Sequence, residues 1–245
     1  MEFFDPDKTT YIQPEVSYYQ AAQPLPSRLI FSPIILSKFP NTSRKLKVKE
    51  LPRIFQGTRL YRIGDNIVYF QGTMGAPATV MFLETLIALG IREVIFLGFA
   101  GSIQQISIGD RLLITEAIRL EGTSYHYLPS TSKCRPAKSL TEALSSFLSK
   151  KEFQVYQGKI CSTDAPFRET YTLIETLRKK NVLAIDMEVA AAFAVANFRR
   201  ISLTSLVIIS DELRDNQWLH VNSDSYTRSY INSFSQILDF YSDRI

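Results

Sequence analysis

Short apolar runs alternate with amphipathic, helix-length segments along most of this 245-residue chain, and this alternation limits the possible folds more than any other feature. A run of roughly four to eight apolar residues is typical of a buried strand, whereas apolar residues recurring every third or fourth position indicate a helix. Strands that alternate with helices form largely parallel sheets covered by those helices. We therefore predict an α/β fold: a single domain whose central mixed, mostly parallel β-sheet is flanked by helices on both faces.

The expected elements follow one another with no glycine- or serine-rich linker between them. A hairpin is expected at Gly64-Asp65, because an apolar or alternating segment flanks this turn pair on each side. The expected strands are 28–31, 59–63, 66–70, 93–97, 111–115, 117–120, 155–161 and 202–209. The expected helices are 78–89, 141–150, 169–180, 186–197 and 223–241.

The first 27 residues differ from the rest. They are rich in Tyr, Gln and Pro, and their apolar residues follow neither the strand pattern nor the helix pattern. Their five aromatic residues argue against full disorder. We predict an N-terminal arm over 1–27 that wraps the body or a neighbouring subunit, and one domain over 28–245.

Composition excludes several classes of protein. The net charge is only +4, and the basic residues at 44–49 lack interleaved aromatics, which favours a solvated loop over a nucleic-acid site. Two cysteines are too few for a disulfide framework and lack metal-ligand spacing. The apolar runs are too short to span a bilayer, and the N-terminus has no signal-peptide pattern. We expect a cytoplasmic protein without metal, membrane or nucleic-acid partners.

An alanine-rich helix is expected to begin near Asp186, with Asp186, Met187 and Glu188 in its first turn, because alanine favours helices and acidic residues favour their N-terminal ends. Burying an unpaired charge beside so apolar a segment would be costly. Glu188 could accept hydrogen bonds from the vicinal hydroxyls of a ligand while Met187 packs on the flat face of its ring. The alternative is a solvent-exposed carboxylate that only stabilises the helix dipole.

Three further segments follow predicted strands, at the edge of the sheet where α/β proteins bind ligands. They are 72–77, 98–102 and 210–212. Their glycines would allow close approach of the backbone to a ligand, although glycine after a strand is also ordinary turn chemistry.

Taken together, these segments resemble the nucleoside phosphorylase family, which includes uridine phosphorylase and hexameric purine nucleoside phosphorylase. The resemblance runs from about Arg53 to Asp211, in matching order and spacing. The stretch Arg-Leu-Glu-Gly-Thr-Ser-Tyr-His at 119–126 is especially similar to uridine phosphorylase. The segments that carry the resemblance are 72–77, 89–92, 98–101, 109–110, 119–126, 163–164, 187–188 and 210–211.

The resemblance implies cleavage of the bond between ribose C1′ and a nucleobase, through a transition state resembling an oxocarbenium ion. It implies that Glu188 binds the ribose hydroxyls, that Met187 packs on the sugar, and that Asp186 stands where relatives place a second glutamate. Asp211 matches the aspartate that protonates a leaving purine, since a carboxyl group in a dry pocket can donate a proton near neutrality. A loop aspartate in a turn or cap is the alternative for Asp211.

The same resemblance implies a base-facing loop near 163–168. Phe167 could stack on the base and Arg168 could donate to a pyrimidine carbonyl, although Arg168 could equally lie on the surface beside Glu169. Phe99 and Ala100, in the glycine turn, complete the expected substrate-binding set.

The phosphate site departs from the family pattern at four positions. Phe31 occupies the position of the glycine in the family's Gly-Asp-Pro turn. Ile35 and Phe96 occupy the positions of two arginines of the family pattern. Phe99 replaces a residue that is usually Thr or Ser. Arg53 alone matches a phosphate-binding arginine, the one that relatives borrow from a neighbouring subunit. Phosphate needs charge-assisted hydrogen bonds, which phenylalanine cannot supply.

Hydrolytic relatives that resemble methylthioadenosine nucleosidase also lack these arginines, but they carry an N-terminal glutamate and an arginine four residues before the last aspartate. Here that second position is Val207, and Glu2 and Glu15 lie in the arm. We therefore predict a phosphorylase-like enzyme for a purine nucleoside or uridine, with no cofactor besides phosphate as a possible co-substrate. The rivals are a nucleosidase that uses water and a nucleoside-binding protein without activity. Because the relatives are homo-oligomers, we expect at least a dimer.

Overall fold

Ten strands pair into one sheet within the part of the chain that the structure, a computed structural model, describes: residues 3–14, 25–40, 42, 46–214, 217–221 and 224–244. The strands are β1 Arg28–Ser32, β2 Val48–Leu51, β3 Arg59–Ile63, β4 Ile67–Gln71, β5 Glu93–Ser102, β6 Arg111–Leu120, β7 Tyr156–Thr163, β8 Val182–Asp186, β9 Ser202–Arg214 and β10 Gln217–His220. The helices are α2 Ala76–Ala88, α3 Lys138–Lys150, α4 Tyr171–Lys179, α5 Val189–Arg199 and α6 Asp224–Ser242, with 3₁₀ turns η1 Thr123–His126 and η2 Pro166–Arg168.

The strand order is β10-β9-β6-β7-β8-β5-β1-β4-β3-β2, and β9 also pairs with β5. This extra pairing closes β5, β8, β7, β6 and β9 into a barrel-like ring, from which β1, β4, β3 and β2 extend. Parallel pairs join β1 to β4 and β5, β5 to β9, and β7 to β6 and β8, whereas the remaining pairs are antiparallel. The predicted single α/β domain with a mixed sheet is confirmed.

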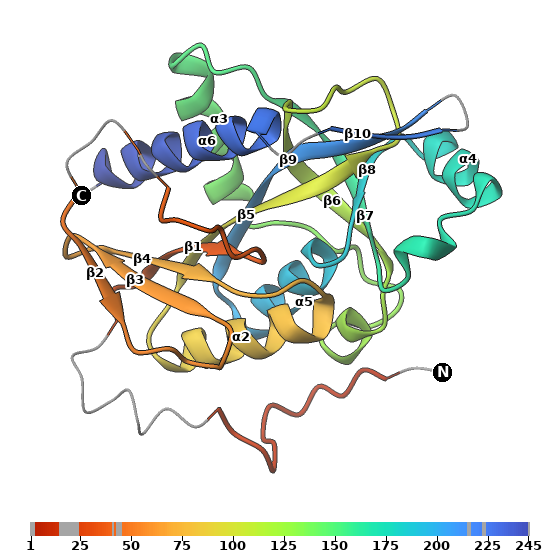
Figure 1. Cartoon of the computed structure of the whole chain (residues 1–245). Helices are drawn as coiled ribbons and strands as arrows, with labels where there is room; N and C mark the ends of the chain where they lie inside the picture. Colours follow the sequence, from red (N-terminus) through yellow and green to blue (C-terminus); the bar gives the residue numbers. More distant parts are fainter. Residues whose placement is uncertain are drawn as a thin grey trace.

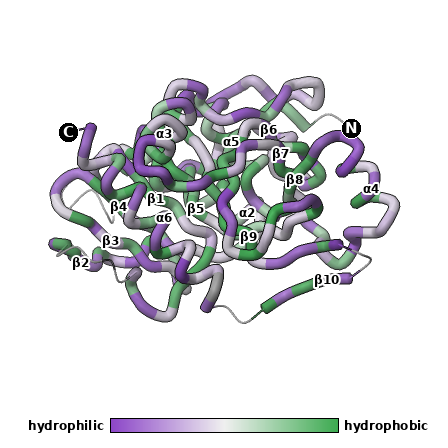
Figure 2. Tube along the Cα trace, turned by 90° about the horizontal axis from the view of Figure 1, so that it is seen from above, coloured by the Kyte–Doolittle hydropathy of each residue, from purple (hydrophilic) through white to green (hydrophobic). Residues whose placement is uncertain are grey.

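Helices cover both faces of this sheet (Figure 1). On one face α2 and α5 pack against apolar side chains that include Phe31, Phe70 and Phe96. On the other face α6 and α3 cover a second cluster that includes Tyr69 and Tyr230. Hydrophobic residues accordingly follow the central strands in Figure 2. None of the described helices is long and apolar enough to cross a bilayer.

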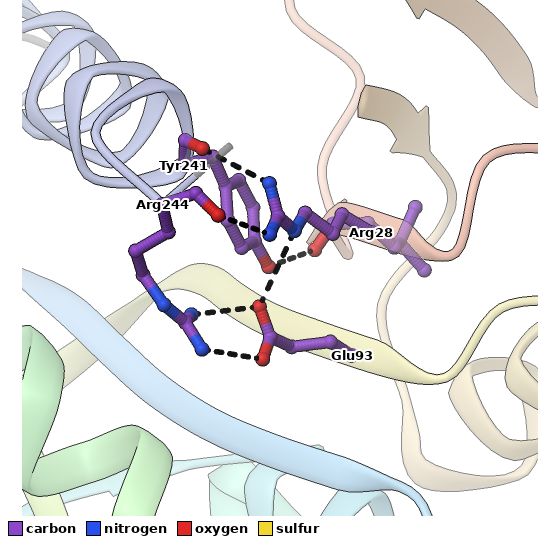
Figure 3. A network of polar contacts seen from close by, with 5 residues as sticks. Arg28, Glu93, Tyr241 and Arg244 are labelled. Carbon is purple, nitrogen blue, oxygen red and sulfur yellow. Dashed lines mark hydrogen bonds and ion pairs between the residues drawn. The ribbon is translucent and has the colours of Figure 1, made fainter. Parts of the chain in front are cut away.

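The C-terminal end of α6 is tied to the N-terminal ends of β1 and β5 (Figure 3). Tyr241 donates to the Leu29 carbonyl at 3.1 Å, and Arg28 donates to the Tyr241 carbonyl at 3.0 Å. Arg244 forms two hydrogen bonds with Glu93, at 2.8 and 3.1 Å. This polar network holds the sheet at the end opposite the carboxyl ends of β1 and β5, so those ends are left to the candidate site.

Two segments that were expected to follow strands, 98–102 and 210–212, lie within strands. β5 continues past the predicted end of its strand through Gly98 and Gly101 to Ser102, and β9 continues through Asp211 to Arg214. Crowding explains these glycines, since a Cβ on Gly98 would lie 2.7 Å from the Phe96 ring. A Cβ on Gly101 would lie 2.8 Å from Asp211 Oδ2. The glycines therefore allow close packing inside the sheet rather than a change of chain direction.

Other boundaries also differ from expectation. The strands expected at 111–115 and 117–120 are one strand, β6, with an irregularity in its pairing to β7 between Ile114 and Glu116. The helix expected from residue 186 begins at Val189, because Asp186 still pairs in β8. The sequence pattern also missed three strands. β2 and β10 are short edge strands without a buried residue, and β8 is a buried strand between the helices expected at 169–180 and 186–197.

Part of the predicted arm lies along the body. The Phe3 ring stacks on His126 with centroids 5.0 Å apart, and the Lys8 ammonium lies 5.4 Å from the centroid of the Phe198 ring. Residues 1–2 and 15–24 of the arm, with Glu2 and Glu15, lie outside the described residues, as do Arg44, Lys45 and residue 223. The division into an arm and a domain stays a prediction.

Candidate functional site

Glu188 is buried where α5 begins, with 4% of its surface exposed. Its Oε1 accepts a 2.6 Å hydrogen bond from the Gly75 backbone N–H, and its Oε2 accepts a 3.3 Å bond from the Met187 N–H. Gly75 precedes α2 with a φ of 109°, a conformation that favours glycine. One carboxylate therefore joins the N-terminal ends of α2 and α5. Burial, followed by the charge of Asp186, raises the pKa of Glu188 to about 8.

Asp186 ends β8 and is fully engaged with the protein. Its Oδ1 accepts from Ser162 Oγ, and its Oδ2 accepts from the backbone N–H groups of Glu188 at 3.0 Å and Val189 at 2.7 Å. Burial raises the pKa of Asp186 to about 6, against the opposing effect of these hydrogen bonds. The carboxylate thus satisfies N–H groups at the start of α5. Its expected contact with a substrate stays a prediction, and such a contact would have to compete with these three bonds.

Asp211 lies on β9, across β5 from the Asp186–Glu188 segment. Gly101 of β5 pairs with Asp211 on one side and with Ile185 of β8 on the other. Two strand spacings therefore separate the two acidic segments, about 10 Å between backbones. The structure brings Asp211, Glu188 and the partly exposed Met187 to one region of the sheet, although they are far apart in sequence.

The Asp211 carboxylate has a hydrogen-bond partner on each oxygen. Ser210 Oγ donates to Oδ1 at 2.6 Å, and the Trp218 indole Nε1–H on β10 donates to Oδ2 at 2.8 Å. Sequence reasoning missed Trp218. The available signal was weak: it is the single tryptophan of the chain and follows Asp211 by seven positions.

The expected contacts of Phe167 and Arg168 with a base stay predictions, since both side chains are exposed in the loop between β7 and α4. Phe167 is 96% exposed and Arg168 is also exposed, both in η2. The next residue, Glu169, is partly buried, and burial together with the charge of Asp211 raises its pKa to about 7. Sequence reasoning named Glu169 only as a neighbour of Arg168, because nothing local in the chain indicates its proximity to Asp211.

Phe99 and Ala100 point to opposite faces of β5. The Phe99 ring packs on α6, with centroids 5.1 Å from Tyr226 and 5.4 Å from Tyr230. Ala100 is buried in the core on the α5 side. The Phe99 side chain is therefore engaged in packing, and the contacts of both residues with a substrate stay predictions.

Phenylalanines stack across three strands where the family pattern places phosphate-binding groups. Phe31 of β1 is in register with Phe70 of β4 and with Phe96 of β5. The Phe31 ring stacks on both, with centroids 5.1 and 5.6 Å apart, and all three side chains are buried. Ile35 is 40% exposed in the loop after β1. The side chains at these positions offer packing surface but no donor to an anion.

Arg53 is exposed in the loop after β2. Because β2 is the edge strand and β5, β8 and β9 belong to the ring, Arg53 lies several strands away from Asp211 and Glu188 in its own chain. Among the described residues there is no cluster of three His, Cys, Asp or Glu side chains that could hold a metal ion.

Comparisons with known proteins agree with this architecture. A sequence model described as the phosphorylase superfamily matches residues 38–240. Uridine phosphorylase of Haemophilus influenzae is 30% identical over 152 residues, which cover 56% of this chain and 60% of the relative. Guanosine phosphorylase of Halorubrum lacusprofundi is 24% identical over 151 residues, covering 61% of this chain and 63% of the relative. The chain thus spans about 60% of the length of these two relatives.

Solved structures extend the likeness of fold to nearly the whole chain. Purine nucleoside phosphorylase from Toxoplasma gondii, in complex with immucillin-H, superposes with a TM-score of 0.79 at 17% identity, covering 97% of this chain and 98% of the other. Uridine phosphorylase from Vibrio fischeri superposes with a TM-score of 0.68 at 23% identity, covering 89% and 87%. At these identities the superpositions concern the fold alone.

Proposed function

Since the chain belongs to the phosphorylase superfamily, we propose that it is an enzyme that cleaves the N-glycosidic bond of a ribonucleoside. The observation that carries this proposal is the arrangement of Glu188 and Asp211, which belong to segments on the two sides of β5 at the same end of the sheet. Glu188 would accept hydrogen bonds from the ribose diol, and Met187 would pack against the sugar. Asp211 would hold a proton for the departing base, which gains negative charge as the bond breaks.

Binding of a diol has a consequence for the charge of Glu188. With a pKa of about 8, the carboxyl group is mostly protonated at neutral pH in the free protein. Two donated hydroxyl hydrogen bonds favour the ionised form, as the N–H of Gly75 does already. Ribose binding would therefore release a proton, and affinity would increase as the pH rises towards 8.

The leaving group is proposed to be a purine. Asp211 supports this choice, because a purine leaving through N9 can be protonated on its ring by such a carboxyl group. The uridine-like stretch at 119–126 has a structural use that is independent of the base. The Arg119 guanidinium donates to Ser124 Oγ and to the carbonyls of Leu128 and Pro129, and its Cζ lies 4.1 Å from the Tyr125 ring centroid. The Arg119 side chain therefore stabilises η1 and the loop that follows it.

Two acceptors for the ribosyl group remain in competition. Family membership favours phosphate, and several curated relatives are named phosphorylases. The stacked Phe31, Phe70 and Phe96 rings favour water instead, because a phosphate dianion needs charged donors. A second copy of the chain could supply Arg53 from its edge-strand loop, and for this reason we also propose a homo-oligomer.

The test is a panel of adenosine, guanosine, inosine and uridine, incubated with the purified protein with and without phosphate, with free base measured by chromatography. Base released only with phosphate supports the phosphorylase, and base released without it supports a nucleosidase. Thermal stabilisation by a nucleoside without release would identify a binding protein and reject the enzyme. The variant Glu188→Ala should lose both binding and release; unchanged affinity and rate would remove Glu188 from the site.

A further inference from the structure

The edge strand β10 lies alongside β9 (Figure 1). In this antiparallel pair His220 is opposite Asp211, and Trp218 is opposite Leu213. Residues opposite one another in such a pair point to the same face of the sheet, and a long side chain can also reach its diagonal neighbour. Trp218 is a diagonal neighbour of Asp211, and its indole Nε1–H donates to Asp211 Oδ2 at 2.8 Å.

The Trp218 ring has further contacts that hold it in place. Its centroid lies 4.8 Å from that of the His220 ring. The indole also forms part of the wall of a cavity of about 200 Å³, together with Leu213 and, from α4, Ile174. Because the side chain is 60% exposed, it contributes little to the core. A substitution of Trp218 therefore tests the hydrogen bond rather than the fold.

A bulge in β9 sets the position of the Asp211 carboxyl group. Ala100 pairs with Ile209 and Gly101 with Asp211, so Ser210 is an extra residue on β9. Such a bulge redirects the side chains beside it. A Cβ on Gly101 would lie 2.8 Å from Asp211 Oδ2, which means that the carboxyl group lies over the glycine of the neighbouring strand. Ser210 Oγ donates to Oδ1 at 2.6 Å, so the two carboxyl oxygens have different partners.

These two partners differ in their ability to accept a hydrogen bond. An indole nitrogen is only a donor, so Oδ2 has to remain an acceptor when Asp211 carries a proton. A serine hydroxyl both donates and accepts. Ser210 Oγ is also 3.4 Å from the Ala100 carbonyl, to which it can donate while it accepts from a protonated Oδ1. The acidic proton of Asp211 therefore belongs on Oδ1.

We propose that Trp218 is a positioning residue that confines the transferable proton of Asp211 to Oδ1 and keeps this oxygen available to the leaving base. The inference rests on the proposed cleavage of a ribonucleoside, in which Asp211 is the proton donor. A carboxyl group without the indole could turn about its Cβ–Cγ bond and present either oxygen. The bond to Trp218 fixes this rotation before the reaction begins, and such orientation of a reacting group lowers the barrier.

The proton can be followed through one turnover. The bond between C1′ and the base nitrogen breaks, its electron pair goes to the base, and a base nitrogen takes the proton from Oδ1. The electron pair of the O–H bond stays on Asp211, whose carboxylate then accepts from Ser210 on Oδ1 and from Trp218 on Oδ2. The acceptor, phosphate or water, forms the new bond to C1′ and gives its proton to solvent. Asp211 regains a proton from solvent once the base has left.

The first test observes the hydrogen bond directly, because Trp218 is the single tryptophan of the chain and gives one indole N–H resonance. In protein with isotopically labelled tryptophan, we expect this resonance to lie downfield and its proton to exchange slowly with water. Asp211→Ala should move the resonance upfield and accelerate exchange by at least about tenfold. Asp211→Asn imitates the protonated acid, since its amide oxygen can accept from the indole, and should keep exchange slow. The matched control Gln217→Ala removes an exposed side chain from the same strand and should alter neither property.

The second test separates a positioning role from a structural one. Trp218→Phe retains an aromatic ring but removes the donor. For the nucleoside that the wild-type protein cleaves, we expect kcat to fall roughly ten- to a hundredfold with KM little changed, as for a lost hydrogen bond to a charged group. Because Trp218 acts through Asp211, adding Trp218→Phe to Asp211→Asn should cause no further loss. A purely structural role would lower kcat by the same factor in both backgrounds. Gln217→Ala should keep the wild-type kcat.

The outcomes separate this inference from the proposed function. An indole resonance that is the same in the wild-type protein and in Asp211→Ala overturns the bond, and fast exchange in Asp211→Asn overturns the placement of the proton on Oδ1. Equal kcat values for the wild-type protein and Trp218→Phe, or an equal loss in the Asp211→Asn background, overturn the positioning role even if nucleosides are cleaved. An indole resonance that depends on Asp211, in a protein that cleaves no nucleoside, supports the bond and rejects the proposed enzyme.

Discussion

Replacing Glu188 by Gln should stabilise the protein in alkaline solution while it abolishes activity. The amide oxygen can still accept from the Gly75 N–H, but the side chain no longer has to ionise inside the protein. A carboxyl group whose pKa is higher in the folded than in the unfolded protein favours folding at low pH. That contribution is complete below pH 4.5 and is lost as the pH rises to about 8.

The magnitude follows from the pKa change. A rise from 4.5 to about 8, at roughly 1.4 kcal/mol for each tenfold change in proton affinity, corresponds to a loss of at most ~5 kcal/mol on ionisation. Relaxation of the site reduces this value, and the amide N–H₂ of Gln faces the Met187 N–H, which costs about 1 kcal/mol. We therefore expect Glu188→Gln to raise the free energy of unfolding by about 2 kcal/mol at pH 8.5.

The assay is urea denaturation of both proteins at pH 5 and pH 8.5, with far-UV circular dichroism as the signal. The stability gain from Glu188→Gln should be present at pH 8.5 and small or reversed at pH 5. Glu142→Gln, at an exposed position on α3, is the control and should change neither value by more than about 0.5 kcal/mol. Equal stability differences at the two pH values would refute the idea that Glu188 is a buried, strained carboxyl group.

Three other substitutions test the site and its surroundings. Asp211→Asn should slow purine release on the order of a hundred- to ten-thousand-fold while ligand affinity changes little, and equal rates in single-turnover assays would reject its acid role. Gly98→Ala should cost about 1–3 kcal/mol and lower the melting temperature, because its Cβ would lie 2.7 Å from the Phe96 ring, which is buried and packed on Phe31; an unchanged melting temperature would contradict this crowding. Phe31→Ala should cost about 3–5 kcal/mol in denaturant titrations, since it removes the middle ring of the stack, and a loss below about 1 kcal/mol would mean that the stack does not support the core.

Local patterns along the chain were sufficient to predict most of the strands and helices and the α/β architecture. The apolar runs that become β1, β4 and β7 and the alanine-rich α5 are recognisable because burial and helix propensity leave a period within a few residues. The order of family motifs indicated a phosphorylase-like fold. The edge strand β10 was missed because it has no buried residue and so leaves no such period, and β8 was missed because its five residues lie directly between two predicted helices.

Long-range pairing decided the rest. That β5 pairs with both β8 and β9 at Gly101 depends on register between segments more than eighty residues apart, which no local pattern records. The pairing of β10 with β9 places Trp218 beside Asp211, and the fold brings Glu169 within reach of the charge of Asp211.

The chain by itself therefore determined most of the strands and helices, and it singled out Asp186, Glu188 and Asp211 as the candidate carboxylates. Only the tertiary structure decided that Gly98 and Gly101 lie within a strand, that Phe31, Phe70 and Phe96 form one stack, and that Trp218 donates to Asp211. The physical reason is that secondary structure depends on neighbours a few positions away. Packing and electrostatic interactions depend on which distant segments the closed sheet brings together.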